Sequence, residues 1–406
     1  MSRALEAWLC NPFTGALVAE GEVPRRPHDP DVFVHAATVA PRGPQRQALV
    51  VGGAGFTPEA ARGAALGEAI ERFESWPRPS DGALARPPQG EPAWGPDDFV
   101  LFSAQQYAAD GFPFAPPDEA SLSPYVCARR IDDGHPVWIP QAFVYLDAPG
   151  GHHVAPMSST GLSAGPPGHP TVLRGLQEVI ERDALVRAWW GEYGIERWDP
   201  ELVWEQLGPE LAAIARRPNL RYAFHRIRTP YCAHACVVTL VGETLEGDCL
   251  SVGSACRATR RESLTKALLE AIQGRHYVRY RISQDDPWSE VPVSFEEHAC
   301  WYSRWPERWA DTAFARADAA CDPDAAQRTD DLAALLGALG PDHPAVVRIV
   351  TPPIVARLAP GWRVLKVVVS GLVPLHGDHR MAHLGAARWR NRPFEQWLAY
   401  PPHPFA

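Results

Sequence analysis

Three stretches of the sequence decide the fold. Residues 57–75 read TPEAARGAALGEAIERFES, residues 171–190 read TVLRGLQEVIERDALVRAWW, and residues 261–280 read RESLTKALLEAIQGRHYVRY. In each stretch apolar residues recur every three or four positions, which is the period of an α-helix. The first stretch also begins with a capping residue, Thr57, followed by Pro58 in the first turn, where a missing amide costs nothing. The sequence therefore predicts three long helices.

Runs with β-strand character separate these helices. Residues 137–146 (VWIPQAFVYL) indicate a strand interrupted by proline, and residues 231–242 (YCAHACVVTLVG) and 249–256 (CLSVGSAC) indicate a pair of strands. Residues 77–120 are rich in Pro, Gly and Asp, which is typical of a surface excursion. Strands and long helices in this order predict a domain of the α/β or α+β class, with sheet and helices in one core.

Composition narrows the class of protein. The chain has 406 residues, of which 46% are hydrophobic and 21% charged, so it can bury a large core and is not a disordered chain. The net charge of −9 argues against a nucleic-acid partner. The sequence has neither a run of about 18 apolar residues nor a secretory signal at its start, so we expect a cytoplasmic protein with reduced cysteines and no membrane partner.

Carboxylates occupy similar places in the three helices, and each helix also carries an arginine nearby. They are Glu68, Glu71 and Arg72 in the first helix, Glu178, Glu181 and Arg182 in the second, and Glu270, Gln273 and Arg275 in the third. A single ExxER motif is more often a solvated face with local ion pairs. Two near-copies of the motif and a third acid-bearing helix favour a shared site, because buried carboxylates repel one another unless cations compensate them. Mg²⁺ is the natural compensator, since it bridges carboxylates to nucleotide phosphates, and arginines donate to phosphate oxygens.

Several motifs in the same order resemble the signatures of YcaO-domain proteins. They are GFTPEAARGAALGEAIERFES from residue 55, SSTGLSAG from 158 followed by GLQEVIERDAL, VGSACRATRRESLTKALLEAIQGR from 252, and GLVPLHGDHRMAHLG from 371 with the closing PPHPFA. The likeness runs from about residue 30 to the end. Such proteins bind ATP without a GxxxxGK[ST] loop, and this sequence contains none.

The resemblance implies an α+β, YcaO-like ATP-binding fold with mixed sheets and long helices that carry metal-binding glutamates. It implies an ATP- and Mg²⁺-dependent cyclodehydratase, which phosphorylates a peptide amide oxygen and forms thiazoline or oxazoline rings from Cys, Ser or Thr of a ribosomal precursor peptide. The five glutamates would then be magnesium ligands. Arg72, Arg182, Gln273 and Arg275 would contact or position the nucleotide. Thioamide or amidine formation, and a non-catalytic peptide-binding role, remain alternatives.

Domain organisation and partners follow from the same resemblance. We expect residues 1–45 to form a lead-in with one or two strands, packed on a catalytic domain over residues 46–406. The lead-in is too short for a leader-peptide-binding module of about 80 residues, so we expect a separate partner protein to supply it. The oligomeric state stays open, with a homodimer as one option.

Three departures from the family pattern concern the site. Ala64 stands where the first helix usually has Ser, and Pro353 stands where a turn usually has an acid. The family's PxPxP ending reads Pro402-His403-Pro404-Phe405-Ala406 here. The α-carboxylate of Ala406, delivered by a stiff tail, is our candidate for the catalytic base.

Three further features have plainer interpretations. Two of them contain residue types that bind metals. The first set is Cys232, His234 and Cys236, and the second set is His376, Asp378, His379 and His383. The first set shares one face of a strand, as alternate residues do, so we expect a strand rather than a zinc site. For the second set we expect a turn or a wall of the site. We expect the glycine-rich run from Gly52 to Gly55 to be a turn before the first helix.

Overall fold

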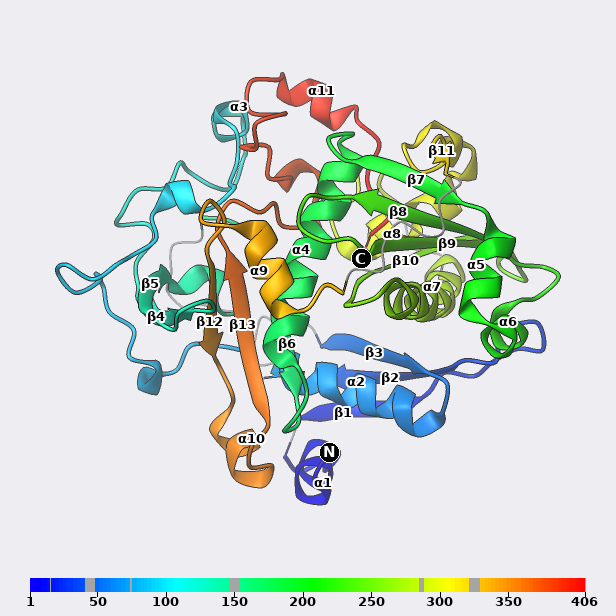
Figure 1. Ribbon diagram of the computed structural model, residues 1–406, viewed down its shortest axis with the longest axis horizontal. Coiled ribbons are helices and arrows are strands. Elements are labelled where there is room, and N and C mark those ends of the chain that lie inside the picture. Colours follow the sequence, from blue (N-terminus) through cyan, green and yellow to red (C-terminus); the bar gives the residue numbers. More distant parts are fainter. Residues whose placement is uncertain are drawn as a thin grey trace.

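A computed structural model describes residues 1–14, 16–40, 48–73, 75–146, 154–284, 288–320 and 329–405. Ala406, our candidate base, lies outside these ranges. Within them the strands form three sheets and the long helices pack against and between the sheets (Figure 1). The expected mixed α+β architecture is therefore confirmed.

The first sheet joins the lead-in to the predicted first helix. Its strands are β1 (Leu17–Glu22), β2 (Phe33–Val39) and β3 (Leu49–Gly55), all antiparallel, and it is covered by α2 (Pro58–Phe73), with α1 (Arg3–Leu9) preceding it. The expectation of a turn from Gly52 to Gly55 was wrong, because these residues complete β3. A Cβ atom on Gly53 would lie 2.4 Å from the backbone of Ala61 and Ala65. Glycine is needed there because it lets α2 approach the strand closely.

The second sheet repeats this arrangement. Its strand order is β10–β9–β8–β7–β11, and it is covered by α7 (Arg260–Ile282). The strands are β7 (Gly194–Trp198), β8 (Arg221–Arg228), β9 (Ala235–Thr244), β10 (Gly247–Cys256) and β11 (Asp318–Ala319), with α5 (Pro200–Leu207) and α6 (Pro209–Ala215) between β7 and β8. A Cβ atom on Gly253 of β10 would lie 2.1 Å from the carbonyl oxygen of Ala267. The units β2–β3–α2 and β9–β10–α7 therefore share one construction, a hairpin followed by a closely packed helix.

The third sheet has the order β5–β4–β12–β13–β6. Its strands are β4 (Tyr125–Arg130), β5 (Pro136–Pro140), β6 (Leu162–Gly165), β12 (Ala345–Ile349) and β13 (Arg363–Val369). β5 is shorter than the predicted strand over 137–146, because Pro140 has no amide to extend the ladder and a 3₁₀ turn, Gln141–Phe143, follows.

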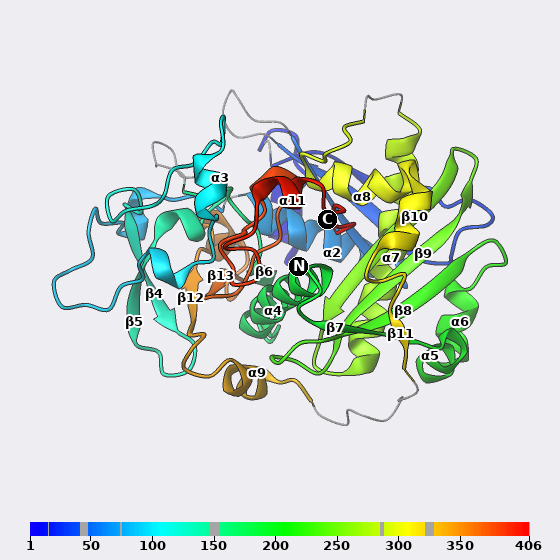
Figure 2. The same cartoon turned by 90° about the horizontal axis from the view of Figure 1, so that it is seen from above.

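Helix α4 (Thr171–Trp189) lies at the centre of the molecule, between the second and third sheets (Figures 1 and 2). Leu176, Ile180 and Trp189 pack in one cluster with Val237 of β9 and Val367 of β13. Since most of its surface is covered, its carboxylates also lie inside the protein. This helix therefore places acidic groups at the junction of the sheets.

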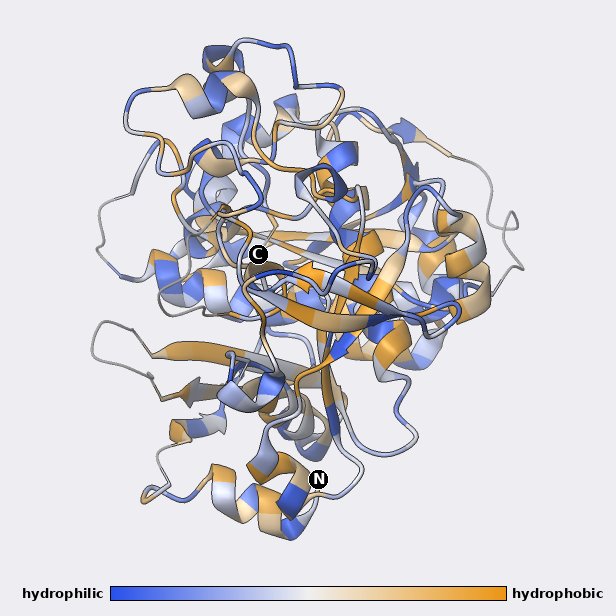
Figure 3. Ribbon diagram, turned by 90° about the vertical axis from the view of Figure 1, so that its left-hand side faces the viewer, coloured by the Kyte–Doolittle hydropathy of each residue, from blue (hydrophilic) through white to orange (hydrophobic). Residues whose placement is uncertain are grey.

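The remaining helices are short and peripheral. They are α3 (Ala104–Ala108), α8 (Phe295–Arg304), α9 (Leu332–Leu339), α10 (Pro353–Leu358) and α11 (Phe394–Leu398). Apolar residues concentrate on the strands, whereas many connecting loops are polar (Figure 3). Of the helices in the described ranges, none combines the length and apolar character needed to span a membrane.

Candidate active site

The two hairpin–helix units each direct one glutamate back to their own hairpin. Glu68 of α2 accepts a hydrogen bond from the amide of Gly52 at 3.1 Å, and Glu270 of α7 accepts one from the amide of Ser254 at 3.3 Å. The acceptor follows the donor by 16 residues in both cases. The repeat therefore places Glu68 and Glu270 at equivalent positions.

Strand β10 also holds a glutamate of the central helix. Glu181, which is 6% exposed, accepts from Ser254 Oγ at 2.7 Å and from the amide of Cys256 at 3.0 Å. Because Ser254 also donates its amide to Glu270, one residue of β10 links the acids of α4 and α7.

Electrostatics connect α2 to α4. Burial, together with the negative charges of Glu178 and Glu68, raises the pKa of Glu71 to about 8 despite the opposing charge of Arg72. Burial also raises the pKa of Glu178, opposed by Arg182 and Arg72. These mutual effects show that the acids of the two helices face a common region that needs more positive charge.

Two predicted arginines lie among these acids. Arg72 has guanidinium nitrogens 3.5 Å from oxygens of both Glu68 and Glu71. Burial lowers the pKa of Arg182, but Glu181, Glu178 and Glu270 outweigh it and raise the pKa overall. The two arginines therefore lie within the carboxylate cluster, defined as Glu68, Glu71, Glu178, Glu181 and Glu270.

Gln273 and Arg275 have different surroundings. A Cβ atom on Gly52 would lie 2.7 Å from Gln273 Nε2. The side-chain amide of Gln273 therefore reaches from α7 to Gly52 of β3, whose backbone amide donates to Glu68. Arg275 is 2% exposed and donates to the carbonyl oxygens of Gly242 and Glu243 on β9, at 3.1 and 2.9 Å. The structure brings Gln273 to the cluster and ties Arg275 to β9; the nucleotide contact of Arg275 stays a prediction.

Sequence reasoning missed Lys366. This residue of β13 is 4% exposed and donates to the carbonyl of Ser158 at 2.6 Å. Burial lowers the pKa of its ammonium group to about 7, against the charges of Glu178 and Glu71. The available signal was a lysine inside the apolar run RVLKVVV. The only other lysine of the sequence, Lys266, lies 3.0 Å from Glu270, so both lysines border the cluster.

A cavity of about 500 Å³ adjoins the cluster. Glu68, Arg72, Arg182 and Lys366 line one part of it, and other lining residues include Phe295, His376 and His383. This volume is in the range of small-molecule sites. Ala64, the position of the missing serine, is exposed on α2 and faces β3 at Gly53.

The carboxylate cluster and the adjoining cavity, which Arg72, Arg182 and Lys366 line, fit a protein that binds a cation together with an anionic ligand. A family model described as YcaO cyclodehydratase, ATP- and Mg²⁺-binding, matches residues 52–373. The chain belongs to this family, and is thus an ATP- and Mg²⁺-binding YcaO cyclodehydratase. A search of curated protein sequences gives no match.

Solved structures with the same fold are distant in sequence. YcaO from Methanopyrus kandleri bound with AMPPCP and Mg²⁺ is 18% identical, with 91% of this chain and 90% of that chain covered and a TM-score of 0.61. A heterocyclase in complex with substrate and cofactor is 17% identical (TM-score 0.70), covering 100% of this chain and 57% of that one. The Escherichia coli microcin synthetase McbBCD complex contains a chain 13% identical (TM-score 0.57), covering 95% and 96%. This chain thus spans little more than half of the heterocyclase.

The residues present fit the family's cofactors, ATP and Mg²⁺. Five carboxylates supply the hard oxygen ligands that Mg²⁺ prefers. Burial, and after it the negative charges of Glu178 and Glu68, raises the pKa of Glu71, and a bound cation would favour the ionised carboxylate. Arg72 Nη1 is buried and, although it lies 3.5 Å from a Glu71 oxygen, makes no hydrogen bond among the described residues, so it can still donate to an anionic oxygen.

Magnesium binding should release a proton and strengthen with pH. Below a pKa of about 8 the Glu71 carboxyl of the metal-free protein is protonated, and a cation must displace that proton. Affinity should therefore rise as the pH approaches about 8 and then level off. Calorimetric titration with Mg²⁺ in two buffers of different ionisation enthalpy measures the protons released. Glu71→Gln should reduce the release, with the remainder coming from Glu178, whose pKa burial also raises; identical release from the wild type and this variant would contradict the assignment.

Proposed function

We propose that the protein is a peptide cyclodehydratase that uses ATP to phosphorylate an amide oxygen of a ribosomal precursor peptide. The ring formed from a Cys, Ser or Thr side chain and the preceding amide is a thiazoline or oxazoline. One observation carries the proposal: three helices direct five carboxylates, two arginines and Gln273 to one site beside a cavity.

The residues divide into ligands for cations and donors for anions. We assign the five glutamates of the carboxylate cluster to Mg²⁺. Arg72, Arg182 and Lys366 line the adjoining cavity, where their charges would bind and orient phosphate oxygens. ATP, when bound, supplies the phosphoryl group that makes the amide oxygen a leaving group. A chain that had lost catalysis would have no chemical need for this set of residues, which disfavours the non-catalytic alternative.

Ring closure also needs a base for the nucleophile and the amide proton. We assign this role to the α-carboxylate of Ala406. Its neighbour Phe405 is 3% exposed and packs against Trp189 and Phe314, with ring centroids 5.9 and 5.8 Å away. The tail is therefore anchored up to the residue before the proposed base.

We further assign recognition of the precursor's leader segment to a separate partner protein. One finding about other proteins supports this: similar chains occur in the Escherichia coli microcin synthetase McbBCD complex, alone and with pro-MccB17 bound.

Mass spectrometry of a reacted precursor peptide tests the proposal. The protein, its partner, ATP and Mg²⁺ should remove one water per ring and make the reacting Cys thiol unavailable to alkylation. Replacement of oxygen by sulfur would identify thioamide formation. Water loss with every thiol still alkylated would indicate an oxazoline from Ser or Thr, or an amidine, and fragmentation of the peptide separates these two by the residue that carries the loss. No ATP hydrolysis in the presence of peptide would support the non-catalytic alternative.

Removing the charge of Lys366 should affect nucleotide and metal in opposite directions. Lys366→Met deletes a cation beside Glu178 and Glu71. We expect nucleotide affinity to fall about tenfold, or about 1.4 kcal/mol, and Mg²⁺ affinity without nucleotide to rise. Calorimetry measures both, with Arg357→Gln on the exposed side of α10 as the control. A parallel loss of both affinities would indicate a structural role for Lys366.

A further inference from the structure

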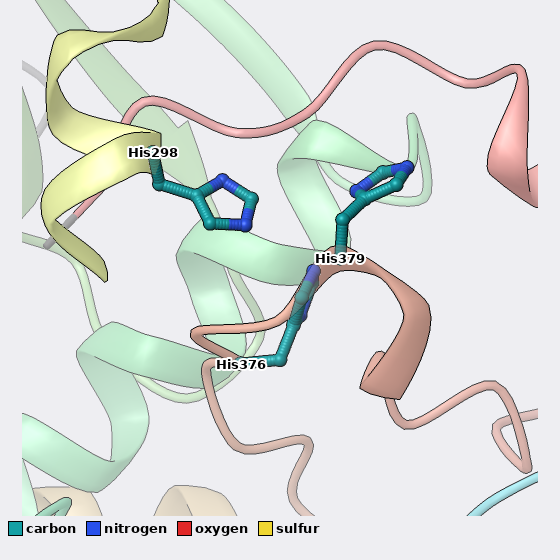
Figure 4. Close-up of side chains that lie close together, drawn as sticks. All are labelled: His298, His376 and His379. Atoms are coloured by element: carbon teal, nitrogen blue, oxygen red, sulfur yellow. The ribbon is translucent and has the colours of Figure 1, made fainter. Parts of the chain in front are cut away.

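Three buried histidines from distant parts of the chain meet outside the carboxylate cluster. His298 comes from α8, His376 from the loop after β13, and His379 from the 3₁₀ turn His379–Met381 (Figure 4). Their exposed fractions are 0%, 3% and 1%. One ring nitrogen from each lies within 4.8 Å of the others. The sequence predicted a turn or a wall of the site for the second and third, and gave no reason to add the first.

Hydrogen bonds on the far side of two rings set their orientation. His298 Nδ1 lies 2.7 Å from the carbonyl oxygen of His403, and His379 Nε2 lies 3.2 Å from that of Trp397. A carbonyl only accepts, so each of these nitrogens carries the proton and the other nitrogen of the ring has a lone pair. Metal-binding histidines have this arrangement, in which a backbone oxygen fixes the tautomer.

The ring nitrogens that these carbonyls do not use, together with those of His376, have no hydrogen-bond partner in the described part of the chain. His298 Nε2, His379 Nδ1 and both nitrogens of His376 are buried without a hydrogen-bond partner there. Burial lowers the pKa of all three rings, so they are in the neutral form that binds metals. An unpaired buried polar atom is costly. Since neutral His376 keeps one N–H, the three rings present three lone pairs without a partner, which indicates a missing ligand.

His403 shows the contrast. Its ring stacks on His298 with centroids 3.9 Å apart, but Nε2 lies 2.9 Å from the carbonyl oxygen of His376 and Nδ1 accepts from the amide of Phe405 at 3.2 Å. Both of its nitrogens are used by the backbone, so His403 supports the group and is not part of it.

We propose that His298, His376 and His379 bind a zinc ion that is distinct from the magnesium site. Neutral imidazoles suit zinc, whereas Mg²⁺ prefers oxygen ligands. Tetrahedral coordination at about 2.0–2.1 Å needs nitrogens about 3.4 Å apart, and the three nitrogens lie within 4.8 Å of one another, so the rings would draw together by at most about 1.4 Å.

The position of the site suggests what the zinc does. It joins α8 to the loop after β13, and through the bond from His298 to the His403 carbonyl it also fixes the C-terminal tail. His376 in addition lines the cavity. Three protein ligands leave a fourth position for water or another small ligand.

Zinc binding to the full chain tests the proposal. The protein is first treated with a chelator and then titrated with Zn²⁺. Excess Mg²⁺ is present throughout so that the carboxylate cluster is already occupied. We expect one tight equivalent of zinc and a higher melting temperature. His376→Gln and His379→Gln should each weaken zinc binding at least about 100-fold. His343→Gln should leave it unchanged, because both ring nitrogens of His343 already have partners, Ser370 O and Tyr231 Oη, each at 2.9 Å.

X-ray absorption at the zinc edge of the wild type covers the case in which the variants fail to fold. Three imidazole ligands without sulfur are expected. Absence of zinc binding, sulfur ligands, or undiminished binding in a folded His376→Gln variant would overturn the proposal.

Discussion

Glu181→Gln should reduce Mg²⁺-dependent ATP binding by at least about 100-fold, the largest single-residue effect that we expect at this site. Glutamine keeps the shape of the side chain and can still accept from the Cys256 amide, but it removes the charge that we assign to the metal. Losing a charged ligand from a shared metal site costs about 3 kcal/mol or more. Glu71→Gln should behave in the same way. Nucleotide titrations with and without Mg²⁺ measure the effect.

The free energy of unfolding of the Glu71→Gln variant shows whether its loss of ATP binding comes from the missing charge or from misfolding. The folded-state pKa of Glu71 lies above its ordinary value of 4.5, so the metal-free protein loses stability as the pH rises from about 4.5 through about 8. Glu71→Gln removes this loss and should stabilise the metal-free protein near pH 8 by about 2–4 kcal/mol. Glu201→Gln, which changes an acid on the surface of α5, is the matched control. Unchanged nucleotide affinity in both Glu71→Gln and Glu181→Gln would refute the metal assignment.

The helices could be predicted from the sequence because their signals are local. Pro58 in a first turn and apolar residues at helical spacing predicted α2, which begins at that residue. The prediction for α4 ended one residue late, and α7 is longer at both ends than predicted. The shared carboxylate region could also be predicted, because three helices carried acids at matching positions.

What could not be predicted depends on contacts between distant residues. The run from Gly52 to Gly55 resembled a turn because glycine has no side chain whose pattern could distinguish a strand from a turn. Its role in β3 is evident only from the close packing of α2 on Gly53. The sequence placed Arg275 with the nucleotide-binding residues because it lies close to Glu270 and Gln273 on the same helix. Its side chain instead points to the carbonyl oxygens of β9, to which it donates. His298 joins His376 only because α8 packs beside the loop after β13, a contact with no local signal.

Extending the chain beyond Ala406 should lower peptide cyclisation about 100-fold or more while ATP binding changes little. A general base contributes about 10²–10⁴ in rate, and an extension replaces the proposed carboxylate by a neutral amide. The preceding residues are fixed: Trp189 Nε1 donates to the Pro401 carbonyl and Tyr302 Oη to that of Pro402, both at 2.8 Å. Rates of ring formation and nucleotide titrations on the same preparation measure the two effects.

A second variant separates the loss of the terminal negative charge from the added volume of the extension. A variant with a C-terminal amide at Ala406 removes the charge and adds almost no volume, so it should lose cyclisation to the same extent as the extended chain. Phe405→Ala keeps the carboxylate but removes a side chain that packs on Trp189 and Phe314, and should lower thermal stability together with cyclisation. Full cyclisation by the amidated protein would refute the base. Equal loss of ATP binding and cyclisation in the extended protein would mean that the tail supports the nucleotide pocket, since the proposed ATP and Mg²⁺ ligands lie on α2, α4, α7 and β13.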